Sequence, residues 1–161
     1  MSKRRKKRAR PIAVKSRVVK TRTIRQRVKL PGPPEIVYQA LTSSAHHEAF
    51  TGAAAHFPVE LGREMSAYGG YITGTVLGLF PGRGFVQTWR TTEWPESCED
   101  SRVEIILEPA GKGTRLTMIH SRLPLEFAPI YARGWRLHYW KPLRQYLEKR
   151  AKRSKKKRSM K

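Results

Sequence analysis

Apolar and polar residues alternate strictly from Thr23 to Leu30. Ile24, Gln26, Val28 and Leu30 fall on one side, and the residues between them are Arg25, Arg27 and Lys29. Alternation with a period of two predicts a half-buried strand, here with a basic outer face. The Pro-Gly pair at 31–32 ends this strand.

Two short helices are predicted next. The pair Pro33-Pro34 suits the first turn of a helix, where a missing backbone N–H is tolerated. Apolar residues then recur at helical spacing as far as Leu41. Ser43 or Ser44 can cap a second helix, and Gly52 is placed to end it.

The segments that follow, up to residue 123, are rich in β-branched and aromatic residues, and turn-forming residues separate them. The predicted strands are Glu64–Tyr68, Tyr71–Leu79, Phe85–Trp94, Arg102–Glu108 and Thr114–Leu123. Their connections are short, whereas parallel strands need a crossover of about a dozen residues. The sequence therefore predicts an antiparallel meander.

A long helix is predicted from about Pro129 to Arg150. The apolar residues at four-residue spacing are Trp135, Tyr139, Leu143 and Leu147. Pro142 lies inside this helix and is expected to bend it near His138, because proline donates no backbone hydrogen bond. A strand, two short helices, a run of strands and one long helix predict an α+β fold.

Charge divides the chain into three parts. The whole sequence carries 34 Lys or Arg and 12 Asp or Glu, a net charge of +22. Residues 1–30 hold 14 of the basic residues and residues 150–161 hold 8, and neither segment contains an acid, so residues 31–149 are neutral. We therefore predict a basic arm over residues 1–22, disordered by itself in its first 17 residues, a domain over 23–149, and a second basic arm over 150–161.

Arms of this kind are typical of proteins that bind phosphates without reading sequence. The predicted nucleic-acid-binding residues are Lys3, Arg4, Arg5, Lys6, Lys7, Arg8 and Arg10, then Arg25, Arg27 and Lys29, and finally Arg150, Lys152, Arg153, Lys155, Lys156, Lys157 and Arg158. Structured RNA or the ribosome is favoured over a DNA element. An anionic membrane surface is the competitor, weakened because the arms carry almost no apolar residues that could insert.

The expected location follows from this charge. It is the cytoplasm, in association with ribosomes or the nucleoid, or the nucleus if the cell is eukaryotic. No apolar run approaches the roughly 20 residues that a membrane span needs.

Motifs for catalysis or for a metal are weak. Gly111–Thr114 lacks the spacing of a phosphate-binding loop and predicts a hairpin turn. His46, His47 and Glu48 are adjacent on a predicted solvent-exposed helix and do not form a zinc motif. The single cysteine, Cys98, has no internal disulfide partner. We predict no catalytic residue, no metal and no cofactor.

Three stretches of the domain carry a family resemblance. The first resembles the middle of heat-shock-protein-90 ATPase activator homologues, which belong to the SRPBCC (START-like, helix-grip) superfamily. It reads FTGAAAHF, followed by SAYGGYITGTVLGLFPGRGFVQTWRTTEWPE. The second is similar to the last hairpin of that family and reads LEPAGKGTRLTMIHSRLP. The third is similar to its closing helix and reads YARGWRLHYWKPLRQYLE. The resemblance covers residues 23–149 and implies a curved antiparallel sheet of six to seven strands wrapped around the C-terminal helix, with an apolar cavity between them.

Five residues are expected around that cavity, namely Trp89, Met118, His120, Trp135 and Tyr139. Met118 and His120 alternate together along their strand, which places His120 at the cavity edge as a ligand donor or a general base. A structural histidine hydrogen-bonded to a neighbouring element is the alternative, and core packing is the alternative for the aromatic residues. Because only His120 is placed to orient a ligand, we expect side chains to fill the cavity.

The sequence therefore predicts a non-catalytic helix-grip domain that its arms tether to nucleic acid. Family members are diverse, so the fold does not fix the function. One alternative is a binder of a small hydrophobic molecule, or a cyclase-like enzyme acting on one. The other is a co-chaperone.

Overall fold

The computed structural model describes residues 19–161. The predicted disorder of residues 1–17 and the seven predicted nucleic-acid-binding residues from Lys3 to Arg10 lie outside the described residues. The remaining sequence predictions can be compared with the structure.

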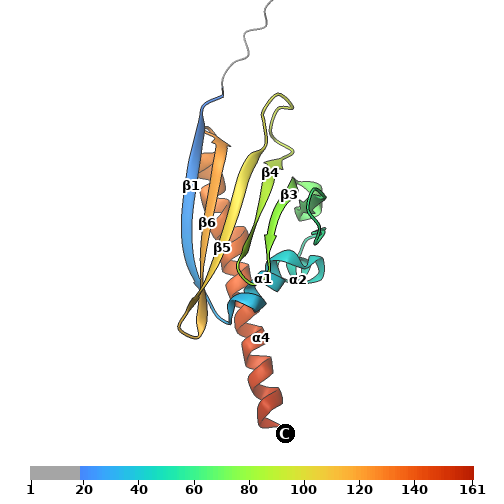
Figure 1. Ribbon diagram of the computed structural model, residues 1–161, viewed down its shortest axis with the longest axis vertical. Coiled ribbons are helices and arrows are strands. Elements are labelled where there is room, and N and C mark those ends of the chain that lie inside the picture. The colour runs from blue at the N-terminus through green and yellow to red at the C-terminus, as the bar shows by residue number, and fades with distance from the viewer. Residues whose placement is uncertain (1–18) are drawn as a thin grey trace, which may run out of the picture.

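Six strands form one antiparallel sheet in the order β1-β6-β5-β4-β3-β2 (Figure 1). The strands are β1 (Thr21–Leu30), β2 (Glu64–Ala67), β3 (Ile72–Phe80), β4 (Gly84–Thr91), β5 (Ser101–Ala110) and β6 (Gly113–Pro124). Strand β1 pairs with β6, so that Gln26 lies opposite Met118, and it forms one edge of the sheet. The predicted α+β fold with a curved antiparallel sheet is confirmed.

The short helices α1 (Pro34–Thr42) and α2 (Ser44–Thr51) follow β1, as predicted. Ser43 caps α2 by accepting a hydrogen bond from the backbone N–H of His46, and Gly52 ends it with a φ of 73°. The predicted exposure of the His46–Glu48 segment is wrong for His47, which is 4% exposed. Its ring packs against Tyr139 of the long helix, with 5.4 Å between ring centroids.

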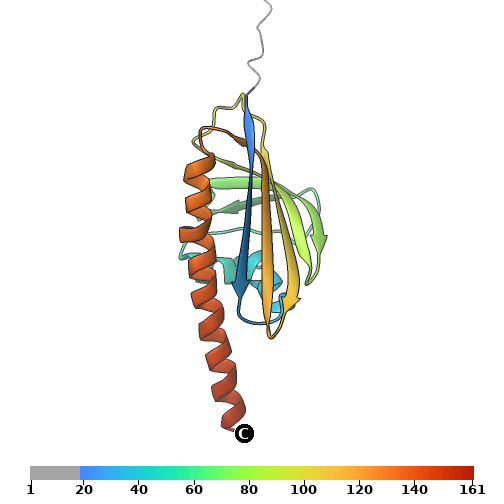
Figure 2. The ribbon, with the colours of Figure 1, turned by 90° about the vertical axis from the view of Figure 1, so that its left-hand side faces the viewer.

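The C-terminal helix lies along one face of the sheet and runs beside β1 (Figure 2). It consists of α3 (Ala128–Trp135), a π turn η2 (Arg136–Trp140) and α4 (Lys141–Ser159). Pro142 explains the π turn, because it has no N–H to donate to the carbonyl of His138 four residues earlier. The hydroxyl of Tyr68 donates to that carbonyl instead. The predicted irregularity near His138 is therefore present.

The helix continues beyond its predicted end at Arg150, as far as Ser159. From Ala151 onward every residue is exposed, and Figure 2 shows this part extending past the sheet. The C-terminal basic segment is thus a helical extension of an element that belongs to the domain.

Candidate functional site

An open cavity of about 570 Å³ lies between the long helix and the short 3-10 turn η1 (Tyr68–Gly70). Its walls are Tyr68, Tyr71, Ile72, Trp89, Ile130, Tyr131, Arg133, Gly134, Trp135, Leu137, His138 and Tyr139. Aromatic and aliphatic side chains dominate this lining. The structure thus has an open cavity where the sequence favoured one filled by side chains.

Three of the five predicted cavity residues line this space, namely Trp89, Trp135 and Tyr139. The other two, Met118 and His120, lie in the core at 0% exposure and are not part of the lining. The reason is that Trp89 and Trp135 stand between His120 and the cavity. Their ring centroids lie 4.8 Å and 5.9 Å from that of His120.

Tilted and edge-on aromatic rings form the inner wall. The centroid of Trp89 lies 5.1 Å from that of Tyr131 and 5.9 Å from that of Trp135. The Trp135 and Tyr139 rings are 4.6 Å apart. Each of these contacts adds about 0.5–1.5 kcal/mol beyond simple burial, so the wall is held in place by its own packing.

His120 is held in a chain of hydrogen bonds beneath this wall. The indole N–H of Trp135 donates to Nδ1 of His120 (3.0 Å), and Nε2 of His120 lies 2.7 Å from Oγ of Ser101. That hydroxyl donates to the carbonyl of Trp89 (2.6 Å). An indole nitrogen can only donate, so Nδ1 is an acceptor and Nε2 carries the proton. Burial lowers the pKa of His120 to about 3, which keeps the ring neutral.

A second polar network fixes the tyrosines of the wall. The hydroxyl of Tyr131 lies 2.7 Å from Oγ1 of Thr91 and accepts a hydrogen bond from the indole N–H of Trp94 (2.9 Å). Tyr71 donates to the carboxylate of Glu93 (2.8 Å), and both burial and this bond raise the pKa of Tyr71. These contacts anchor the two sides of the cavity in the sheet.

Three tyrosines of the lining, Tyr68, Tyr71 and Tyr131, were not predicted from the sequence. Tyr131 precedes Trp135 and Tyr139 at the same four-residue spacing, so helical periodicity could have identified it. Tyr68 and Tyr71 flank the Gly69-Gly70 pair, which the sequence identified only as a turn. Nothing in the local pattern indicates that this turn faces the long helix.

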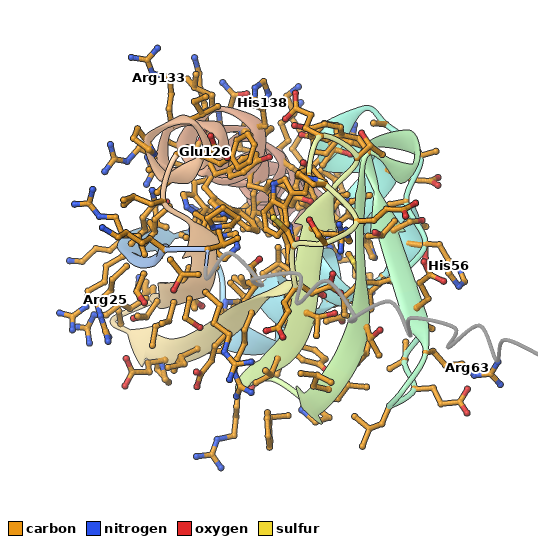
Figure 3. The ribbon with its side chains drawn as sticks, turned by 90° about the horizontal axis from the view of Figure 1, so that it is seen from above. Arg25, His56, Arg63, Glu126, Arg133 and His138 are labelled. Atoms are coloured by element: carbon orange, nitrogen blue, oxygen red, sulfur yellow. The ribbon has the colours of Figure 1, made fainter. Side chains whose placement is uncertain are left out.

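Two features of the cavity are polar. The indole nitrogen of Trp89 is buried and has no hydrogen-bond partner among the described residues. At the rim, Arg133 and His138 are exposed and extend from the helical layer, whereas His56 and Arg63 lie toward the β2 edge of the sheet (Figure 3). A ligand in this cavity would therefore meet a cation, Arg133, at the entrance.

A smaller space of about 20 Å³, close to the volume of one water molecule, lies deeper between the sheet and the helix. Trp135 and Tyr139 line both spaces and separate them. Nδ1 of His47 and Oε1 of Gln87 are buried there without a partner among residues 19–161. Burial lowers the pKa of His47 to about 4.

The predicted nucleic-acid-binding residues that the structure describes lie outside both spaces. Arg25, Arg27 and Lys29 are exposed on the edge strand β1. The seven predicted residues from Arg150 to Arg158 lie on α4, and only Arg150 is partly buried, with its guanidinium 5.8 Å from the ring centroid of Tyr146.

Residues 19–161 contain no cluster of three or more His, Cys, Asp or Glu side chains that could hold a metal ion. No helix among them is both long enough and apolar enough to cross a membrane.

Solved structures share this architecture. An Hsp90 activator from Plasmodium falciparum superposes with a TM-score of 0.72 at 19% identity, covering 78% of this chain and 96% of that one. A Mesorhizobium loti protein gives 0.67 at 26% identity, covering 80% and 98%. The Aha1 dimer from Colwellia psychrerythraea gives 0.67 at 22% identity, covering 78% and 96%.

The comparison with curated proteins gives no match. A protein family, in contrast, matches most of the domain. Residues 31–148 match the family described as "Activator of Hsp90 ATPase homolog 1-like protein". This span contains every residue that lines the cavity. The chain therefore belongs to the family of activator of Hsp90 ATPase homolog 1-like proteins.

Proposed function

We propose that the protein is a non-catalytic binder of a small hydrophobic molecule, which it holds in the cavity between η1 and the long helix. The observation that carries this proposal is the cavity itself, about 570 Å³ in volume and lined mainly by aromatic and aliphatic side chains. Ligand sites of small proteins commonly have volumes of about 300–1,000 Å³ and linings of this kind.

The lining also favours a class of ligand. Most of the molecule would be apolar, because it packs against Trp89, Tyr131 and Trp135. A carboxylate could reach Arg133 at the rim. An apolar molecule with one oxygen-bearing end fits these groups.

The geometry supports binding over catalysis. The lining contains no Asp or Glu, and its one histidine, His138, is exposed at the rim. His120, the general base considered from sequence, has both ring nitrogens engaged by Trp135 and Ser101. It therefore has no free nitrogen with which to take a proton from a ligand.

Gly134 provides a test that leaves the fold intact. It lies in α3 on the cavity lining, and a Cβ built there meets nothing within 4 Å. Gly134→Leu should fold normally, since leucine favours a helix over glycine, yet it should fill the mouth of the cavity. The experiment measures the rise in melting temperature that dodecanoic acid produces.

We expect this rise in the natural protein and in the matched control Gly134→Ala, and we expect it to disappear in Gly134→Leu. Full retention of the rise in Gly134→Leu would show that the fatty acid binds elsewhere. No rise in any of the three proteins would argue against a ligand of this class.

A second candidate function is attachment to nucleic acid through the basic segments, with RNA or the ribosome as the favoured partner. The observation that favours it is the end of α4, where residues 151–161 are all exposed and include seven Lys or Arg and no acid. The proposed location is accordingly the cytoplasm with ribosomes or the nucleoid, or the nucleus of a eukaryotic cell. A chaperone partner, the remaining alternative, rests on the family description alone.

This second function is tested by comparing the full chain with a chain that ends at Arg150. Binding to an unstructured RNA should weaken on truncation, and its dependence on salt should become shallower because fewer counterions are released. Equal binding by both chains would remove the C-terminal segment from the proposal.

A further inference from the structure

A groove of about 340 Å³ runs between the edge strand β1 and the long helix, on the face of the helix away from the aromatic cavity. Its lining consists of Arg25, Gln26, Arg27, Val28, Arg136, Trp140, Lys141 and Arg144. Figures 1 and 2 show β1 and the helix side by side over this length. Figure 3 shows Arg25 extending from the β1 edge.

Hydrogen bonds hold the two walls together. Gln26 donates to the carbonyl of Ala132 (2.8 Å) and accepts from the indole N–H of Trp140 (2.7 Å). Arg144 donates to the carbonyl of Lys29 (3.0 Å). These bonds come from the buried floor and from one end of the groove, so its shape is fixed before any ligand arrives.

The groove is strongly positive, although residues 31–149, which supply three of its five cations, are neutral as a whole. Five of its eight lining residues are cationic and none is acidic. Residues 31–149 as a whole carry equal numbers of acids and bases. The ion pairs among the described residues are Arg63–Glu60, Arg90–Asp100 and Arg115–Glu108, and none involves the groove. Unneutralised like charges held close together raise the local potential and favour an anion.

We propose that this groove binds the phosphodiester backbone of a nucleic-acid strand, which continues from it along the exposed basic end of α4. The proposal rests on the second candidate function and names the surface of the domain that takes part in it. The groove adds Arg136, Lys141 and Arg144 to the nucleic-acid-binding residues predicted from the sequence. These three were not predicted because residues 31–149 contain equal numbers of acidic and basic residues.

Continuity of charge is the main argument for a chain-like ligand. Arg25 and Arg27 are two residues apart on a strand, or about 6.6 Å. Lys141 and Arg144 face them from the first turn of α4. One exposed acid, Glu148, follows, and the same helix then carries the cations from Arg150 to Arg158. With its 19 residues, α4 is about 28 Å long. A row of cations of this length matches a polyanion better than a single small phosphate.

The shape and the residue types favour nucleic acid over a membrane. The site is a groove between two elements, whereas a bilayer presents a flat surface. The end of α4 offers only Ala151 and Met160 as apolar side chains, which is too few to insert among lipid chains. Four of the five groove cations are arginines, whose planar guanidinium groups bind phosphate oxygens in pairs.

The test compares two triple variants of the full chain. The groove variant is Arg136→Gln, Lys141→Gln and Arg144→Gln. The matched control is Arg83→Gln, Arg102→Gln and Lys112→Gln, which removes the same charge from exposed positions outside the groove. Binding of a fluorescent oligouridylate is measured by anisotropy between about 50 and 200 mM salt.

For the groove variant we expect the slope of log affinity against log salt to fall by about 2, since each lost contact to a single strand removes about 0.7. The control variant should keep the natural slope. Circular dichroism checks that both fold, and Arg25→Gln with Arg27→Gln replaces the groove variant if the loss of the Arg144 bond to Lys29 unfolds it.

The outcomes separate the two proposals. Equal slopes in both triple variants, with RNA binding retained, would overturn the groove and leave the arms as the binding elements. An absence of RNA binding by the natural protein would overturn both proposals. Binding to phosphatidylserine vesicles without binding to RNA would do the same and would identify a membrane surface as the partner.

Discussion

Trp135 donates its indole N–H to Nδ1 of His120, and this hydrogen bond of 3.0 Å joins the long helix to strand β6. It also decides the role of the histidine. With Nδ1 accepting from the indole and Nε2 facing Ser101, the ring is a neutral, fully bonded part of the core. The sequence indicated His120 as a possible base at the cavity edge. In the structure it lies in the core and supports the wall residues Trp89 and Trp135.

Removal of the indole N–H should therefore destabilise the protein. In Trp135→Phe most of the aromatic contact remains, but Nδ1 of His120 becomes a buried acceptor without a donor. We expect the free energy of unfolding, measured in urea, to fall by about 1–3 kcal/mol. The control is the same substitution in a His120→Leu background, where no acceptor remains and the cost should be clearly smaller. Equal costs in the two backgrounds would mean that this bond contributes nothing.

Two buried histidines should make the stability of the fold depend on pH. Burial lowers the pKa of His47 to about 4 and that of His120 to about 3, from an ordinary value of 6.5. Between these values and pH 6.5 the unfolded chain binds more protons than the folded one, so stability falls as the pH falls. Each histidine contributes roughly 1.4 kcal/mol per pH unit in this window.

Melting temperatures between about pH 7 and pH 5 test this dependence. His120→Gln, which keeps a polar group, should flatten the profile. A profile for His120→Gln as steep as that of the natural protein would show that His120 is not buried in its neutral form.

The sheet and the helix ends could be predicted from sequence because their signals are local. The alternation of Ile24 to Leu30, the serine cap before α2 and Gly52 after it each act within a few residues. The helix beyond Arg150 was not predicted, because the apolar periodicity ends at Leu147, whereas the high helix propensity of Lys, Arg and Ala continues the helix to Ser159.

The open cavity was missed for a different reason. Trp89, Trp135 and Tyr139 were predicted to lie around a cavity, but no pattern fixes the distance between the helix and the turn opposite it. That distance depends on Pro142, which frees the carbonyl of His138, and on Tyr68, which reaches across to it. The burial of His47 is likewise a tertiary effect, caused by the packing of α2 against the long helix.

Gly74 should be irreplaceable in the sheet. A Cβ at this position would lie 1.9 Å from the carbonyl oxygen of Thr88 on the neighbouring strand, so β3 and β4 would have to separate. We expect Gly74→Ala to reduce the free energy of unfolding by more than about 3 kcal/mol, or to prevent folding. The opposite result is expected at Gly134, where the helical Gly134→Ala should stabilise by up to about 1 kcal/mol. Similar stabilities for the two variants would contradict this backbone contact.

The basic end of α4 should contribute little to the stability of the domain. Every residue from Ala151 to Lys161 is exposed, so a chain that ends at Arg150 loses no buried apolar surface. Its melting temperature should equal that of the full chain, or rise at low salt, because seven like charges are removed. The control is Leu147→Ala in the truncated chain. Leu147 is 2% exposed, and its truncation should cost about 2–5 kcal/mol. A clear drop in melting temperature on truncation alone would mean that the basic helix packs on the domain through contacts that the structure does not contain.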